Sequence, residues 1–140
     1  MREDPGHFYF ILDVYENFPN LKFFLLGSNY FVILYENNYV GNVLIYKFDW
    51  NKIKALTNLQ KHKVSFQSAT GIFNDPNALT IYDDEHSDYE DRWITLGLES
   101  SGIILVVIHT FSELDNDVVN IRIISARKAT KNEVKLYNGE

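Results

Sequence analysis

Cysteine is absent from this sequence of 140 residues, and basic residues are outnumbered by acidic ones. Without cysteine the chain has no disulfide framework and no thiolate metal site, a composition that fits a reducing cytosol. Thirteen Lys and Arg against 19 Asp and Glu give a formal net charge of -6 at pH 7. Nucleic-acid binding normally draws on an excess of Lys and Arg. An RNA target would therefore require locally clustered basic residues.

Targeting and cofactor signatures are also missing. The beginning, MREDPGHFYF, has acids and a proline where a signal peptide has basic residues and an unbroken apolar core. The apolar run at 23–35 is interrupted by Gly-Ser-Asn and is shorter than the ~20 residues of a spanning helix. No P-loop, dinucleotide glycine fingerprint, nucleophile elbow or zinc-protease helix is present. We therefore expect a cytoplasmic protein with no membrane contact and no cofactor.

The composition changes near Lys47. Residues 1–47 are rich in aromatics and asparagine, and KFFLLGSN and YFVILYENNYVGNVLIYK resemble short strands, with a hairpin bend at 36–38. Residues 48–140 look like a conventional mixed domain of a size that buries one core. We predict an N-terminal extension at 1–47, possessing a small antiparallel β segment, and a main domain at 48–140.

Three helices are predicted in the main domain. The first covers about 51–61 and begins at Asn51 or Asp49, and Ser65 caps a second one in FQSATGIF. The capping box TKNE, from Thr130 to Glu133, opens a last helix that continues through Tyr137.

Four β-rich segments lie between these helices, at 78–82, 92–98, 103–111 and 118–126. Turn residues at 99–102 and 113–117 separate the later ones, which indicates an antiparallel meander. The fold class is therefore α+β, a small antiparallel sheet flanked by two helices before it and one after it.

Two residues interrupt apolar strands. The pleat places His109 on the same face as Leu105 and Val107, so it is either a site residue at a strand end or a core histidine. Arg122 faces away from Ile121, Ile123 and Ser125. It either pairs with a carboxylate of the acidic loop DDEHSDYED or recognises a phosphate, whose oxygens a guanidinium contacts two at a time.

Other charged residues gather in three places. Arg127 and Lys128 come where the last strand ends and the last helix begins, a position that favours an anion. Lys54, Lys61 and His62 belong to a second basic cluster on the first helix. Asp83, Asp84 and His86 in the acidic loop could be imagined as a metal site, but a solvated loop explains them as well and EF-hand spacing is absent, so no metal is predicted.

Read together, FDW, NLQKHKVSF, FNDP, DRWITLG, VVIHT and RIISARKAT, followed by Glu133 and Tyr137, resemble the BrnT family of toxins from bacterial type II toxin-antitoxin pairs. The resemblance covers about 48–137, and KHxVxF and RIISARKA are its most specific pieces. It implies a RelE-like fold and a ribonuclease activity that inhibits translation and growth. It also implies a BrnA-like ribbon-helix-helix antitoxin in a complex of two toxins and two antitoxins. Only the antitoxin would contact DNA directly.

Metal-free RNA cleavage needs a base for the 2′-hydroxyl proton, cations for the phosphorane and an acid for the leaving 5′-oxygen. The resemblance assigns charge stabilisation to Arg122 and Arg127. His109 is the first candidate for base or acid, ahead of His62 and His86. Glu133 and Tyr137 complete the catalytic set, or alternatively Glu133 only caps its helix and Tyr137 belongs to the core. The predicted RNA-binding residues are Lys54, Lys61, His62, Arg92 and Lys128.

The chain departs from the family at several positions. It has Lys63 where the family usually has glycine, and it lacks basic residues at Ile103 and Phe111. These losses keep open an alternative function, a weak or inactive homologue that binds a DNA-binding antitoxin as co-repressor. The family has no counterpart of residues 1–47, which are either an appendage or upstream of a true start at Val43 or Leu44.

Overall fold

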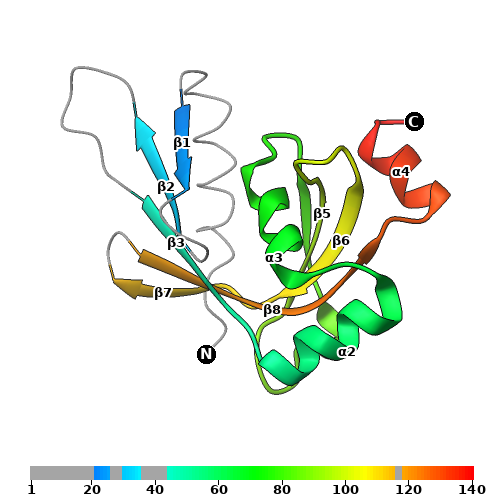
Figure 1. The fold of residues 1–140 in the computed structure, drawn as a ribbon, viewed down its shortest axis with the longest axis horizontal. Coiled ribbons are helices and arrows are strands. Elements are labelled where there is room, and N and C mark those ends of the chain that lie inside the picture. Colours follow the sequence, from blue (N-terminus) through cyan, green and yellow to red (C-terminus); the bar gives the residue numbers. More distant parts are fainter. Residues whose placement is uncertain (1–20, 26–29, 36–43, 116–117) are drawn as a thin grey trace.

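A computed structural model describes residues 21–25, 30–35, 44–115 and 118–140, and within them the fold is α+β, as predicted (Figure 1). The strands are β1 (Leu21–Leu25), β2 (Tyr30–Tyr35), β3 (Leu44–Asp49), β4 (Leu79–Tyr82), β5 (Trp93–Leu98), β6 (Ile104–His109), β7 (Ser112–Asp115) and β8 (Val118–Lys128). The helices are α2 (Lys52–His62), α3 (Phe66–Ala69) and α4 (Lys131–Tyr137), with 3-10 turns η1 (Thr70–Asn74) and η2 (Asp84–His86). None of the helices in these described ranges is long and apolar enough to cross a membrane.

Helix starts follow the predicted caps. Asn51 Oδ1 accepts from Lys54 N at 3.0 Å and begins α2, and Ser65 Oγ begins α3 by accepting from Ser68 N at 3.0 Å. The capping box of Thr130 and Glu133 is present at α4. These predictions are confirmed. Each cap is a hydrogen bond within one turn of the chain, which is why the sequence alone could indicate it.

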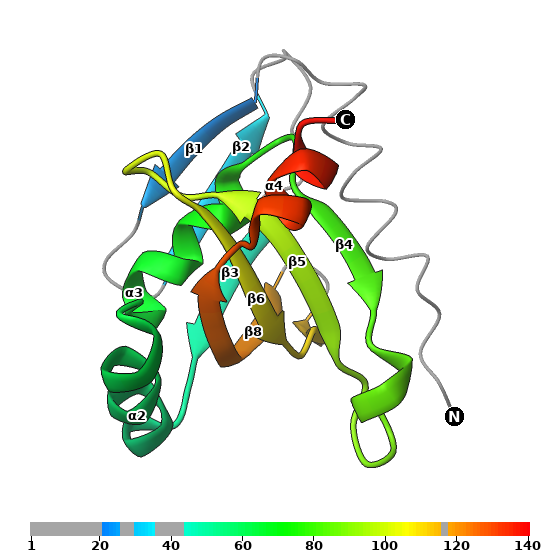
Figure 2. The ribbon, with the colours of Figure 1, turned by 90° about the vertical axis from the view of Figure 1, so that its right-hand side faces the viewer.

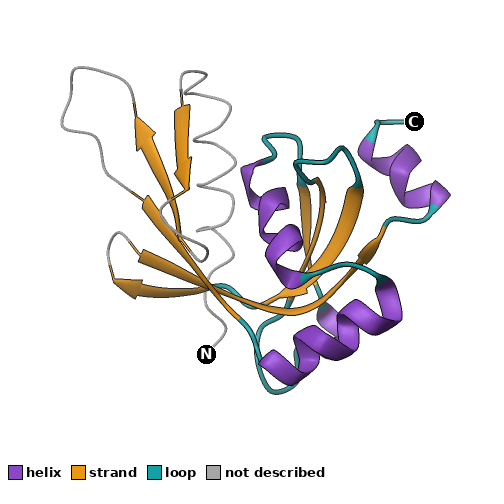
Figure 3. Ribbon diagram, viewed as in Figure 1, coloured by secondary structure: helices purple, strands orange, loops and turns teal. Residues whose placement is uncertain are grey.

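The predicted meander is confirmed as the antiparallel series β4-β5-β6-β8. The prediction of a purely antiparallel sheet is wrong, because β3 pairs in parallel with the first half of β8. The 11-residue β8 is longer than β6, so β6 pairs only with its second half and β3 adds to its first half. One mixed sheet results, in the order β1-β2-β3-β8-β6-β5-β4 (Figure 3).

The predicted turn at 113–117 is partly wrong. Residues 112–115 form β7, which pairs antiparallel with β8. Its sequence, SELD, has little β propensity, so pairing with a neighbouring strand rather than local preference makes it a strand. Of the predicted N-terminal strands, β1 and β2 form an antiparallel pair and β2 pairs with β3. The predicted hairpin bend at 36–38 lies outside the described residues.

The core lies on one face of the sheet, under α3 and η1. Its largest buried side chains are Phe48, Phe66, Ile72, Leu105, Ile121 and Ile123. Close approach of η1 to β5 requires glycine at Gly97, because a Cβ there would lie 2.9 Å from Ile72 Cβ. Figure 2 shows α4 over β5 and β6 on the other side, and we call this other side the open face.

Lys63 ends α2 with a φ of 60°, in the left-handed region. This is the position at which the sequence departs from the family's glycine. Its backbone N–H bonds Leu59 O at 3.0 Å, the bond that commonly closes a helix at a glycine. The backbone conformation that favours glycine is therefore retained although the side chain has changed.

Candidate functional site

A β-bulge in β8 decides which way its arginines point. The register with β6 shifts at Ile124, so that Ala126 rather than the predicted Ser125 follows Ile123 into the core. A bulge inserts one unpaired residue and reverses the alternation beyond it. Arg122 and Arg127, which strict alternation would place on opposite faces, therefore both lie on the open face.

The open face is apolar between these two arginines. Leu96 and Val106 are buried there, and Leu79 and Ile81 of β4 are exposed at its edge. Pairing of Val106 with Arg127 puts Arg127 at the end nearest α4. Arg122 lies at the opposite end of the face, beside the loop that connects η2 to β5.

Arg127 is held by Glu133. Two parallel hydrogen bonds of 2.8 Å join the guanidinium to both carboxylate oxygens. Glu133 Oε2 also accepts from Thr130 N at 2.7 Å as part of the capping box. The hydrogen bonds from Arg127 lower the pKa of Glu133 to about 2 against the effect of burial, and the same pair raises the pKa of Arg127. Glu133 thus fixes both α4 and the arginine.

Tyr137 is directed to a different partner. Its hydroxyl donates to Asp75 Oδ2 at 2.7 Å, and the same oxygen accepts from Leu98 N at 2.7 Å. Burial, with the neighbouring Asp75 carboxylate, raises the pKa of Tyr137 to about 12. Tyr137 therefore anchors α4 to the loop after η1.

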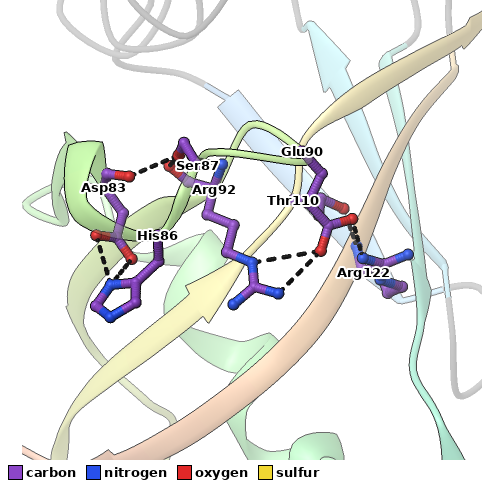
Figure 4. Close-up of polar contacts among 7 residues, drawn as sticks. All are labelled: Asp83, His86, Ser87, Glu90, Arg92, Thr110 and Arg122. Atoms are coloured by element: carbon purple, nitrogen blue, oxygen red, sulfur yellow. Dashed lines mark hydrogen bonds and ion pairs between the residues drawn. The ribbon is translucent and has the colours of Figure 1, made fainter.

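Arg122 and Arg92 share one carboxylate, that of Glu90 (Figure 4). Arg92 Nη2 lies 3.1 Å from Glu90 Oε1, and Arg122 Nη2 contacts Oε2. Burial raises the pKa of Glu90, but the two arginines outweigh it and the net shift is downward. The predicted pairing of Arg122 with the acidic loop is thus confirmed. Glu90 was not among the predicted site residues. Arg122 is distant from it in sequence, and no local pattern indicates its pairing with Arg92 in the same loop.

Asp83 and His86 form a second contact in the same loop. Both Asp83 carboxylate oxygens lie near His86 Nδ1, at 3.0 and 3.1 Å. The Asp83 side chain is 6% exposed, whereas that of His86 is 61% exposed. Ser87 Oγ donates to Asp83 O at 2.6 Å and accepts from Arg92 N at 3.0 Å, which ties the loop together. In Figure 4 the His86 ring and the Arg92 guanidinium extend from the loop in the same direction.

His109 lies in the core and not on the open face. Its ring is wholly buried and packs edge-on against Phe73, with centroids 4.9 Å apart. Nδ1 donates to Thr110 O at 2.9 Å, and Nε2 is 2.7 Å from Thr95 Oγ1. Burial lowers the pKa of His109 to about 4, although the Thr110 bond acts to raise it. This arrangement is the core histidine that the sequence left open as one alternative.

The remaining predicted RNA-binding residues are dispersed. Lys54 and Lys61 are exposed and His62 is half-buried on α2, while Lys128 is exposed at the end of β8. Figure 2 shows α2 and the β4–β5 connection on different sides of the sheet. Two members of the predicted RNA-binding set meet predicted catalytic residues: Arg92 shares Glu90 with Arg122, and the Lys128 carbonyl accepts from Arg127 Nη1 at 3.3 Å. Among the described residues no group of three or more His, Cys, Asp or Glu side chains is arranged to hold a metal ion.

Comparison with known proteins gives the class of this chain. A family model described as "Ribonuclease toxin, BrnT, of type II toxin-antitoxin system" matches residues 50–133. The crystal structure of the Brucella abortus ribonuclease toxin BrnT is similar at 22% sequence identity and a TM-score of 0.40, over 60% of this chain and 96% of that one. No curated protein matches the chain.

The family match spans more than half of the sequence. The chain therefore belongs to the BrnT family of ribonuclease toxins of type II toxin-antitoxin systems.

Proposed function

We propose that this chain is an endoribonuclease that arrests growth by cleaving RNA in the cytoplasm without a metal ion. The observation that carries the proposal is the cluster in Figure 4, where an imidazole oriented by a buried carboxylate lies in one loop with Arg92, beside Arg122. Oriented imidazoles transfer protons, and paired guanidiniums hold phosphate oxygens. These are the parts that 2′-hydroxyl attack on a phosphodiester requires.

His86 is the base in this proposal, in the role that the sequence gave first to His109. Because a carboxylate oxygen only accepts, His86 Nδ1 carries the proton toward Asp83 and Nε2 keeps a lone pair for the substrate. Nε2 takes the 2′-hydroxyl proton, and Asp83 stabilises the imidazolium that forms. The 2′-oxygen bonds to phosphorus, the bond to the 5′-oxygen breaks, and that oxygen takes a proton from solvent. The products are a 2′,3′-cyclic phosphate and a 5′-hydroxyl.

Arg92 and Arg122 hold the phosphate oxygens during this step. Glu90 occupies the place between them, so the RNA phosphate takes over contacts that the carboxylate makes in its absence. Arg127 binds a further phosphate along the open face, while Glu133 and Tyr137 position α4 beside it. The fully exposed ring of Tyr89, next to Glu90, offers a surface on which a base can stack.

The test is cleavage of a fluorescent RNA by the purified full chain. His86→Ala should lower the rate at least about a hundredfold, the usual contribution of an acid-base residue. Asp83→Asn should lower it as well. Asp84→Asn is the matched control, because Asp84 is the exposed acid next in sequence and its loss should not lower the rate. Equal rates for His86→Ala and the parent at equal folded concentration would remove His86 from the mechanism.

A second function is favoured by one observation, the neutralisation of Arg92 and Arg122 by Glu90. A chain whose arginines never release this carboxylate would bind its antitoxin and act only as a co-repressor. Growth arrest and RNA degradation on expression support the nuclease, and their absence with antitoxin binding intact supports the co-repressor.

The proposed partner is a BrnA-like ribbon-helix-helix antitoxin, in a 2:2 complex. Residues 48–140 of this chain are proposed as a RelE-like toxin domain. The extension at 1–47 is proposed as an appendage, since β2 of the extension pairs with β3 and β1 pairs with β2. Native mass spectrometry of the two proteins expressed together tests the stoichiometry.

A further inference from the structure

Helix α2 carries an apolar stripe on its outer side. Ile53, Leu56 and Leu59 are spaced three residues apart and so share one side of the helix, and they are 74%, 63% and 43% exposed. Their helical spacing would normally indicate a face packed on a core. In this protein none of the described residues buries that face.

The inner side of α2 is attached by other means. Asn58, the buried residue of α2, donates from Nδ2 to Ala126 O at 2.8 Å and to Val64 O at 3.0 Å. Its Oδ1 accepts from Ala126 N at 3.1 Å, so the amide pairs with the edge of β8 as a strand would. Helix α2 is thus fixed to the sheet by a polar side chain, which leaves the apolar stripe available.

The segment that carries the apolar stripe is basic, and Lys52 lies on the same side of the helix as the stripe. The sequence from Trp50 to Asn74 contains no Asp or Glu, in a chain with 19 of them. The basic residues of this segment are Lys52, Lys54, Lys61, His62 and Lys63. An exposed apolar patch on a segment with charge of one sign marks a surface for a partner of the opposite charge.

We propose that α2 is the docking surface for an acidic amphipathic segment of the antitoxin, which covers Ile53, Leu56 and Leu59 and pairs its carboxylates with Lys52 and other basic residues of the same segment. The inference rests on the partner assigned under the proposed function and extends it to a particular surface. A second copy of this chain fits poorly, because two such helices would bring lysine against lysine. RNA fits poorly as well, because the apolar stripe has no aromatic ring for a base to stack on.

The test measures the dissociation constant of the full chain for the ribbon-helix-helix protein encoded beside it, by calorimetry at two salt concentrations. Leu56→Glu should weaken binding at least about tenfold, because one leucine loses its burial and a carboxylate meets carboxylates. Lys52→Glu should weaken it and reduce its salt dependence. Ile81→Glu on β4 is the matched control, because Ile81 is also 63% exposed and lies on the open face.

Four outcomes would overturn the inference. Binding that survives Leu56→Glu removes α2 from the interface, and binding lost only in Ile81→Glu moves the interface to the open face. A dimer of the isolated chain that Leu56→Glu converts to a monomer, seen by light scattering, makes the occupant a second copy. Reduced affinity of Lys52→Glu for an RNA oligonucleotide, with antitoxin binding unchanged, assigns α2 to RNA.

This measurement is independent of catalysis. Circular dichroism of each variant confirms that α2 is folded, which is expected because the substituted side chains are exposed. A chain that does not cleave RNA would contradict the proposed nuclease, yet its antitoxin binding would still decide the role of α2. An active chain carrying Leu56→Glu should remain toxic in the presence of the antitoxin.

Discussion

Acidification should destabilise this protein through His109 at pH values where carboxylates are still ionised. The ring is wholly buried, and both nitrogens are engaged by Thr110 and Thr95. A protonated ring would need to donate from Nε2 as well and would be a charge in an apolar core. Burial therefore lowers the pKa of His109 from its ordinary value of 6.5 to about 4, against the smaller opposing effect of the Thr110 bond.

The sign and size follow from proton linkage. Between pH 6.5 and 4 the unfolded chain binds a proton at His109 that the folded protein excludes, so stability rises with pH across this window and falls on acidification. Each pKa unit corresponds to about 1.4 kcal/mol. The free energy of unfolding should therefore fall by about 2 kcal/mol between pH 7 and 5, and by about 3 kcal/mol by pH 4. Total stabilities of about 5–15 kcal/mol make this a measurable fraction.

Urea unfolding followed by the fluorescence of Trp50 and Trp93 measures this change. Comparison at pH 7 and pH 5 isolates the histidine, because carboxylates with lowered pKa values, such as Glu133, add acid sensitivity mainly below about pH 4.5. His109→Gln should show a smaller stability difference between the two pH values, whatever its stability at pH 7. An equal pH dependence in the variant and the parent would refute the assignment of a buried neutral imidazole.

Three further predictions concern α4, the arginine cluster and α2. Glu133→Gln should cost about 1–2 kcal/mol at pH 7 from the capping box and a partly exposed ion pair. With a folded pKa of about 2, this contribution is present above about pH 4.5 and is lost as the pH falls toward 2, which urea unfolding across that range checks. Glu90→Gln should raise affinity for a short RNA about fivefold, since Arg92 and Arg122 lose a competitor worth about 1 kcal/mol, and unchanged fluorescence anisotropy would contradict that competition. Lys63→Gly should stabilise by about 1 kcal/mol, measured by thermal unfolding, because glycine adopts its φ of 60° without strain.

Local features of this fold were predictable from sequence, and features that depend on distant partners were not. The caps at Asn51, Ser65 and Thr130 bond within one turn, so the residues themselves indicate them. The parallel pairing of β3 with β8 joins segments about 70 residues apart, and no local pattern records it. The bulge at Ile124 is likewise defined only by its neighbouring strand.

The same limit applied to the candidate site. His109 ends a strand and His86 comes shortly after one, and nothing local separates a ring buried against Phe73 from one that faces solvent. Burial of Asp83 beside His86 depends on the hydrogen bonds by which Ser87 closes the loop. From the sequence this segment was described as a solvated acidic loop, because nothing in it indicates that closure. Arg122 was recognisable because an arginine in an apolar strand needs a partner. The sequence did not indicate which acidic residue is that partner.

The distribution of charge suggests why such a chain would be controlled by a protein partner. The site cluster lies in a loop that also carries Asp84, Glu85 and Asp88, whose charges oppose the approach of RNA phosphates. The acid-free stretch from Trp50 to Asn74 is positive and exposes aliphatic side chains, so it attracts an acidic protein and can bury apolar area with it. Binding on α2 draws on the hydrophobic effect and on charge, whereas binding at the site must first displace Glu90. An antitoxin that docks on α2 can therefore bind the toxin tightly without contacting the arginines.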